Sequence, residues 1–198
     1  MTLWIKICGL TSPAAVAAAV DAGADAVGFV FHAASPRHVA PATAAALARE
    51  VPSSVARVAV TRHPTQAEVD AILAGFRPDA LQTDAADLDA LTLPAALGRL
   101  PVLRTGAAPP AHLPRRCLYE SADSGRGATA DWQAAAALAR RTELVLAGGL
   151  TPANVAAALA AVRPFGVDVS SGVERAPGRK DTGLIRDFIA AARAAAPQ

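Results

Sequence analysis

Short runs of β-branched and aromatic residues alternate along the chain with longer runs rich in alanine and leucine. Apolar runs of about four to eight residues predict buried strands, and the longer alanine-rich runs predict helices. Strands are predicted over residues 4–8, 26–31, 55–60, 79–82, 101–104, 116–120, 143–147 and 166–170. Helices are predicted over residues 12–23, 41–51, 65–75, 85–91, 131–141, 151–161 and 181–195, with a weaker candidate near 107–113 in a proline-rich and alanine-rich segment.

Residues that start or end helices flank several of these runs. A cap or a first-turn proline precedes three of them, at Ser12-Pro13, Pro41 and Thr151-Pro152. Asp131 and Asp181 are expected to cap the helices that follow them. Gly23 and Gly75 stand where helices are expected to stop, because glycine adopts the left-handed conformation that ends many helices.

Strands alternating with helices are typical of parallel βα units, and eight such units can close into a barrel. An open doubly wound sheet would alternate in the same way, but no GxGxxG fingerprint follows the first strand. The 198 residues contain no visible linker or second domain. We therefore expect an α/β fold with a single catalytic domain over residues 1–198, a compact (βα)8 TIM barrel.

Composition and charge indicate which kinds of partner the protein is not expected to bind. Charged residues make up 18 % of the chain and the net charge is +2, without a block of like charges, so neither nucleic acid nor a membrane surface is expected. No apolar run approaches the ~18 residues of a membrane span, and no apolar leader is visible. Cys8 and Cys117 are too few for a disulfide framework, which favours reduced thiols in the cytoplasm. The slightly basic balance suits an anionic small molecule bound by a monomer or homodimer.

The rule that catalytic residues of a barrel lie at the C-terminal ends of its strands selects a small set here. Cys8 ends the first predicted strand, Arg37 follows the second, and Glu120 ends the sixth. Two turns rich in glycine and serine end the last two strands, at Gly148-Gly149 and Ser170-Ser171-Gly172. Such turns predict a phosphate site, because glycine lets backbone N–H groups approach a phosphate closely. The alternative is that these glycines only provide the positive φ of tight turns.

Strand alternation predicts an ion pair below the thiol. Lys6 shares one face of the first strand with Cys8, and Asp168 shares one face of the eighth strand with Ser170. The two strands are neighbours in a closed barrel, and a lone buried charge is costly, so Lys6 and Asp168 are expected to pair. A cation there favours the Cys8 thiolate and lowers its pKa. The alternative is a solvated Lys6 and a Cys8 that packs as a small apolar residue.

Five segments resemble phosphoribosylanthranilate isomerases in order and in spacing. They are KICGLT at 6–11, DAVGFVF at 25–31, SPRHV at 35–39, LAGGLTPANV at 146–155 and VDVSSGVERAPGRKD at 167–181. The resemblance implies a (βα)8 barrel that converts N-(5-phosphoribosyl)anthranilate to 1-(2-carboxyphenylamino)-1-deoxyribulose 5-phosphate in tryptophan biosynthesis. This Amadori rearrangement uses no metal or organic cofactor. A general acid protonates the ring oxygen of the sugar, and a general base removes the proton from C2.

The resemblance also implies roles for individual residues. Cys8 matches the general base, and Glu120 stands where the family usually has an aspartate as general acid. Arg37 matches the arginine that holds the anthranilate carboxylate, a task suited to a guanidinium fork. The phosphate loops are matched by Gly148, Gly149, Ser171 and Gly172. Gln82 matches a glutamine with a supporting role.

Several positions depart from the family pattern or remain open. The longer side chain of Glu120 reaches roughly an ångström further than aspartate, and an uncompensated shift of that size costs ~100-fold in rate. Arg104 replaces a lysine, and Asp123 is the alternative acid. One interpretation of Glu174, Arg175, Arg179 and Lys180 is that they surround the phosphate electrostatically, but a solvated loop is the default expectation for each. The alternative functions are a different phosphosugar isomerase or epimerase and a non-catalytic phosphosugar-binding paralogue.

Overall fold

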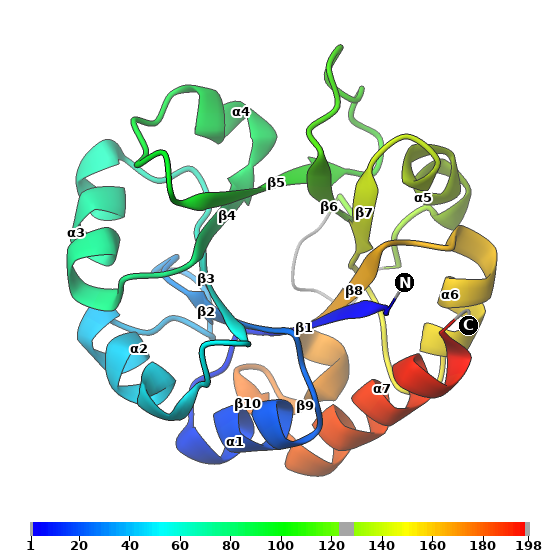
Figure 1. Ribbon diagram of the computed structural model, residues 1–198, viewed down its shortest axis with the longest axis horizontal. Coiled ribbons are helices and arrows are strands. Elements are labelled where there is room, and N and C mark those ends of the chain that lie inside the picture. Colours follow the sequence, from blue (N-terminus) through cyan, green and yellow to red (C-terminus); the bar gives the residue numbers. More distant parts are fainter. Residues whose placement is uncertain (1, 123–128, 197–198) are drawn as a thin grey trace.

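The computed structural model describes residues 2–122 and 129–196, and eight of its strands form a closed parallel barrel (Figure 1). The barrel strands are β1 (Trp4–Cys8), β2 (Ala26–Val30), β3 (Ala56–Val60), β4 (Ala80–Asp84), β5 (Gly98–Arg104), β6 (Arg116–Glu120), β7 (Glu143–Leu146) and β8 (Gly166–Val169). They follow one another in chain order, and β8 closes the barrel by pairing with β1. The expected TIM-barrel fold is therefore confirmed.

Helices surround the barrel on its outer side (Figure 1). They are α1 (Pro13–Asp21), α2 (Pro41–Leu47), α3 (Gln66–Phe76), α4 (Ala85–Asp89), α5 (Trp132–Ala139), α6 (Val155–Val162) and α7 (Thr182–Ala195). Ser12, Asp131 and Asp181 cap α1, α5 and α7 as expected, because each side chain accepts from a backbone N–H of the first turn. Within the described residues, no helix is both long and apolar enough to cross a membrane.

Three predicted helix boundaries are wrong. The helix expected over residues 41–51 ends at Leu47 and is followed by a short 3-10 helix over Ala48–Glu50. Gly75 does not end α3, which continues to Phe76 and stops before Arg77 with a φ of 55°. Phe76 packs against Phe29 with ring centroids 5.1 Å apart, so tertiary packing extends the helix by one residue. The helix expected from residue 151 begins only at Val155. The preceding residues form a turn that Asn154 holds by accepting from Thr151 N at 2.8 Å.

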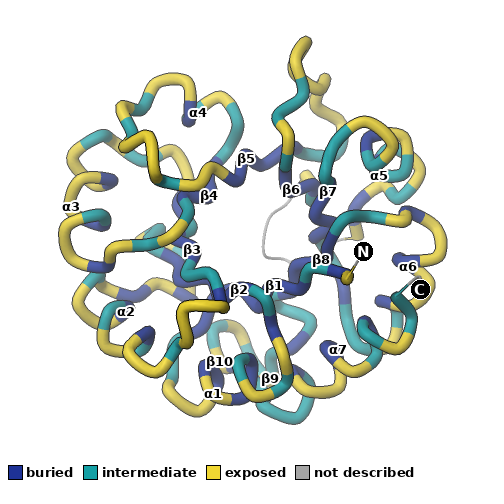
Figure 2. Tube along the Cα trace, viewed as in Figure 1, coloured by how far each residue is buried: buried dark blue, intermediate teal, exposed yellow. Residues whose placement is uncertain are grey.

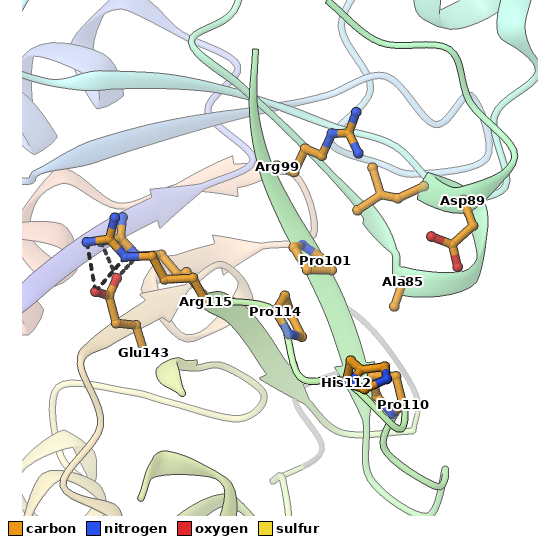
Figure 3. Close-up of a pocket in the computed structure, with 11 residues that line it drawn as sticks. Ala85, Asp89, Arg99, Pro101, Pro110, His112, Pro114, Arg115 and Glu143 are labelled. Atoms are coloured by element: carbon orange, nitrogen blue, oxygen red, sulfur yellow. Dashed lines mark hydrogen bonds and ion pairs between the residues drawn. The ribbon is translucent and has the colours of Figure 1, made fainter. Parts of the chain in front are cut away.

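The weak helix candidate near 107–113 is also wrong. Residues 105–115 connect β5 to β6 without a helix, since Pro109 and Pro110 lack N–H donors and Gly106 has a φ of 85°. The outer face of β5 is consequently uncovered in part. Arg99 and Pro101 of this face line a surface hollow together with residues of α4 and of the connection (Figure 3).

The apolar residues form two layers that fix which side chains point into the barrel. A small interior cluster contains Leu100, Val102, Leu118, Val145 and Ala147. A larger cluster fills the space between strands and helices, so buried positions follow the strands while the outer helix surfaces are exposed (Figure 2). On β6 the alternation is plain, because Leu118 belongs to the interior cluster and Cys117 and Tyr119 to the outer one. Glu120 therefore continues the inward row of Leu118 to the mouth of the barrel.

A small antiparallel hairpin after β8 was not expected from the sequence. It consists of β9 (Glu174–Ala176) and β10 (Arg179–Lys180). Gly178 at its turn has a φ of 77°, and a Cβ there would lie 2.3 Å from the carbonyl oxygen of Pro36. The Thr11 hydroxyl donates to the Gly178 carbonyl at 3.0 Å. The hairpin thus packs on the loops that follow β1 and β2.

Candidate active site

A cavity of about 830 Å³ opens at the C-terminal ends of the strands. It brings together seven of the residues singled out from the sequence: Cys8, Arg37, Gln82, Glu120, Asp168, Ser170 and Ser171. Gly148, Gly149 and Gly172 do not line this cavity. Asp123, the alternative acid, lies outside the described residues.

The predicted ion pair below the thiol is present. Lys6 Nζ lies 2.8 Å from Asp168 Oδ1, and the Lys6 side chain is completely buried. Gly28 on the neighbouring strand β2 makes room for this arrangement, since a Cβ there would lie 3.1 Å from Cys8 Sγ and 3.2 Å from Lys6 Nζ. Cys8 is itself 6 % exposed and lines the cavity. The thiol therefore sits directly above a buried pair of charges.

Lys6 lowers the pKa of Cys8 as expected, but burial of the thiol outweighs this effect. Burial raises the pKa of the Cys8 thiol, and the opposing charges of Lys6 and Lys180 only reduce that rise. For Lys6 itself, burial would lower the pKa, but Asp168 and Cys8 outweigh this effect and raise it. The ammonium group beneath the sulfur therefore offsets part of the cost of burying a thiolate.

The expectation that Glu174 and Lys180 lie in a solvated loop is wrong, because both side chains are buried. The Glu174 carboxylate accepts from Arg37 Nε and from Arg37 Nη2, each at 2.8 Å. Lys180 Nζ lies 2.6 Å from Glu174 Oε1 and donates to Ser170 O at 2.9 Å. The two cations outweigh the effect of burial and lower the pKa of Glu174. Arg175 and Arg179 are exposed as expected, although they lie on the strands of the hairpin and not in a loop.

The carboxylate of Glu120 shares a guanidinium with a second carboxylate. Arg104 Nη1 lies 2.7 Å from Glu120 Oε1, and Arg104 Nη2 lies 2.5 Å from Asp84 Oδ1. The three residues come from the adjacent strands β4, β5 and β6, with Arg104 and Glu120 directly opposite in the register. The sequence rule on strand ends applies equally to Asp84 and Arg104, and it would have found both.

His63 extends this chain of charges toward the surface. Its Nδ1 lies 3.0 Å from Asp87 Oδ1, and its Nε2 lies 3.7 Å from Asp84 Oδ2. Across the described residues, His63, Asp84 and Asp87 form the one group whose geometry would suit a metal ion, with ligand atoms within 4.8 Å of one another. Arg104 already donates to Asp84, and Thr83 Oγ1 donates to Asp87 at 2.9 Å. The group therefore continues the network of polar contacts around Arg104.

The two turns proposed for phosphate differ in the reason for their glycines. Gly148 and Gly149 have φ values of 84° and 66°, which favour glycine. Gly172 lacks a positive φ and is needed for close approach instead, because a Cβ there would lie 1.8 Å from the Leu150 carbonyl oxygen. The turn after β8 is therefore packed directly against the one after β7.

Gln82 lines the cavity and carries a buried polar atom that has no partner among the described residues. The residue is 6 % exposed, and the atom is Oε1. Buried acceptors are normally satisfied, so an acceptor left open in a cavity wall is suited to a hydrogen-bond donor of a ligand.

Comparisons with known proteins give a consistent result. The family described as N-(5'phosphoribosyl)anthranilate (PRA) isomerase matches residues 5–191. The N-(5'-phosphoribosyl)anthranilate isomerase of Paracoccus denitrificans is 45 % identical, over 100 % of this chain and 99 % of that protein.

Solved structures agree with this similarity. A phosphoribosyl anthranilate isomerase in complex with reduced 1-(o-carboxyphenylamino)-1-deoxyribulose 5-phosphate is 29 % identical, with a TM-score of 0.78 over 98 % of this chain and 100 % of that one. Monomers generated from the dimeric enzyme of Thermotoga maritima are 30 % identical, with a TM-score of 0.81 over 98 % and 100 % of the two chains.

Proposed function

This chain belongs to the N-(5'-phosphoribosyl)anthranilate isomerase family, and on that premise we propose that Cys8 and Glu120 are the general base and the general acid of its reaction. The reaction converts N-(5-phosphoribosyl)anthranilate to 1-(2-carboxyphenylamino)-1-deoxyribulose 5-phosphate in tryptophan biosynthesis. The assignment rests on one observation: a thiol, a carboxylate and a buried arginine line the same cavity at the C-terminal ends of the strands.

Two proton transfers define what the residues must do. Glu120 donates to the ring oxygen, which opens the sugar to a Schiff base, and Cys8 then removes the proton at C2. The pKa of the thiol is raised by burial, so the ammonium groups of Lys6 and Lys180 are needed to make the thiolate accessible. The enolamine formed in this way tautomerises to the ketone.

The remaining polar groups bind the two ends of the substrate. Arg37 binds the anthranilate carboxylate. The phosphate binds where Ser170 and Ser171 line the cavity, and the Gly148-Gly149 turn, which packs against the turn of Ser170-Ser171-Gly172, adds backbone N–H groups next to it. Gln82 Oε1, which has no partner in the described part of the chain, accepts from a hydroxyl of the sugar.

Assembly and location follow from the same assignment. Residues 1–198 act as one catalytic domain, working as a monomer or as a homodimer like the dimeric Thermotoga relative. Sedimentation of the purified protein distinguishes the two states. A reducing environment keeps a catalytic thiol from being oxidised, and both cysteines are free, which supports a cytoplasmic location.

A coupled assay tests the proposal, with N-(5-phosphoribosyl)anthranilate generated in place and its loss followed by fluorescence. The parent is expected to be active and Glu120→Gln to lose ~10²–10⁴-fold in turnover. An inactive parent that phosphate still stabilises against heat would indicate a binding protein. An unimpaired Glu120→Gln variant would mean that another group is the acid.

A further inference from the structure

We propose that Glu174 is a positioning residue for substrate recognition, which orients the Arg37 guanidinium toward the anthranilate carboxylate and holds Lys180 against Ser170. The proposal rests on the assignment of Arg37 to that carboxylate. It adds a residue on the β9–β10 hairpin, which lines the same cavity as Cys8 and Arg37.

The contact between Glu174 and Arg37 is a fork of two parallel hydrogen bonds. Arg37 Nε and Nη2 donate to the two carboxylate oxygens, each at 2.8 Å. Their side chains are only 9 % and 4 % exposed, so water does not loosen the pair. A bidentate contact sets the plane of the guanidinium, which a single hydrogen bond would leave free to rotate.

The aliphatic part of Arg37 is fixed from the opposite side. A Cβ on Gly9 would lie 2.6 Å from Arg37 Cδ, so the absence of that atom provides the space that the side chain crosses. The Ser35 hydroxyl accepts from the Arg37 backbone N–H at 3.1 Å. The aliphatic part and the guanidinium of Arg37 are therefore both ordered before substrate binds, so binding loses less side-chain conformational entropy.

The same carboxylate also holds Lys180. Glu174 Oε1 accepts from Arg37 Nε at 2.8 Å and from Lys180 Nζ at 2.6 Å. Lys180 donates further to Ser170 O and Ser170 Oγ, and its side chain is 1 % exposed. Removing Glu174 would take away the carboxylate that lies between two buried cations, a change that is expected to be costly. One residue therefore connects carboxylate recognition with the surroundings of Cys8.

The hairpin gives Glu174 a fixed position relative to the substrate loops. The Gly178 N–H donates to Glu174 Oε2 at 3.3 Å, and the Gly178 carbonyl accepts from Thr11 of the loop after β1. Gly178 also approaches Pro36, the residue before Arg37. The carboxylate and the arginine that it orients are thus carried by loops in direct contact.

The effect of this orientation can be measured as the ratio of the affinities for two ligands that differ only in the carboxylate. One is reduced 1-(o-carboxyphenylamino)-1-deoxyribulose 5-phosphate, and the other is its counterpart without the carboxyl group. We expect the parent to bind the first ligand roughly 10–100-fold more tightly, as for a charge-assisted hydrogen bond. In Glu174→Gln the neutral amide does not hold the fork, and this ratio is expected to fall ~10-fold.

Three outcomes separate the possible failures. An equal loss for both ligands, or an unchanged or larger ratio, overturns the role of Glu174. Arg37→Gln is expected to abolish the ratio. If Arg37→Gln keeps the ratio, Arg37 does not bind the anthranilate carboxylate and its assignment is wrong. If the ratio is lost in Arg37→Gln but kept in Glu174→Gln, the assignment of Arg37 stands and only the positioning role of Glu174 is refuted. If Glu174→Gln does not fold, Glu174→Asp keeps the charge, is too short to hold both cations, and is expected to lower the ratio as well.

Glu143 provides a matched control at the opposite end of the barrel. Its carboxylate lies 2.7 Å from Arg116 Nη2 and 3.2 Å from Arg115 Nη2, at the start of β7 (Figure 3). Glu143→Gln removes a carboxylate that also bridges two cations, and it is expected to leave the ratio at the parental value. A fall as large as that in Glu174→Gln would overturn the proposal.

Discussion

Arg104 and Glu120 face each other across β5 and β6 at the mouth of the barrel, with 2.7 Å between Nη1 and Oε1. The same guanidinium also donates to Asp84 on the other side of β5. The proposed general acid is therefore held by a cation that is itself shared, and this arrangement suggests a first test.

Arg104→Met is expected to lower kcat by about 10–100-fold, since it leaves two carboxylates near each other without their common cation and displaces Glu120. Arg104→Lys keeps the charge without the fork and is expected to fall between Met and the parent. Arg99→Met is the matched control, because Arg99 lies on the outer face of the same strand (Figure 3). Parental kcat in Arg104→Met would show that Glu120 needs no such support.

The two cysteines offer an internal comparison for the base. Cys8→Ala is expected to lose ~10²–10⁴-fold in turnover, since it removes the group that accepts the C2 proton. Cys117 is buried on the outer side of β6, so Cys117→Ala is expected to retain turnover. Both variants are measured with the fluorescence assay. Near-parental turnover of Cys8→Ala would refute its assignment as base.

Removing the whole Lys6–Asp168 pair is expected to affect stability and activity differently from removing Lys6 alone. Lys6→Met leaves a buried carboxylate unpaired and is expected to cost about 3–5 kcal/mol in the free energy of unfolding. The double variant Lys6→Met/Asp168→Leu is expected to recover most of that loss but not the activity, because the thiol still lacks its cation. Urea titration gives the stabilities. Recovery of turnover in the double variant would contradict a role for Lys6 in catalysis.

Alkaline pH is expected to destabilise the fold. Burial raises the pKa of Cys117 from 9.0 to about 11, so the folded state keeps a proton that the unfolded chain releases first. This contribution, about 3 kcal/mol for two pKa units, is fully present below pH 9 and is lost between pH 9 and 11. The pKa values of Lys6 and Cys8 are also raised, which gives the same sign.

Unfolding in urea at pH 8, 9.5 and 11 measures this loss for the parent and for Cys117→Ala. The substitution is expected to lower stability slightly at every pH but to make the decline above pH 9 shallower. Parallel curves for the two proteins would show that Cys117 does not titrate in the unfolding equilibrium.

The features that could be predicted from the sequence depend on the alternation of side chains along a strand and on which strands are neighbours. The Lys6–Asp168 pair is an example, because a period of two and the closure of β8 on β1 suffice to place both side chains. Glu174 and Lys180 were missed because their burial depends on how a short hairpin packs on two distant loops. Gly75 was misjudged for a similar reason, since it marks the approach of α3 to Pro41, where a Cβ would come within 2.8 Å.

The connection over residues 105–115 contains no helix, so the chain can be opened there without changing how the βα units are arranged around the barrel. Near the two ends of the chain, the Leu3 carbonyl accepts from Arg193 on α7. A short added linker can therefore join the ends, and new termini can be opened at the exposed Pro109-Pro110 step. Such a circular permutant would begin just before β6 and end just after β5, so that Glu120 and Arg104 would meet from opposite ends of the chain.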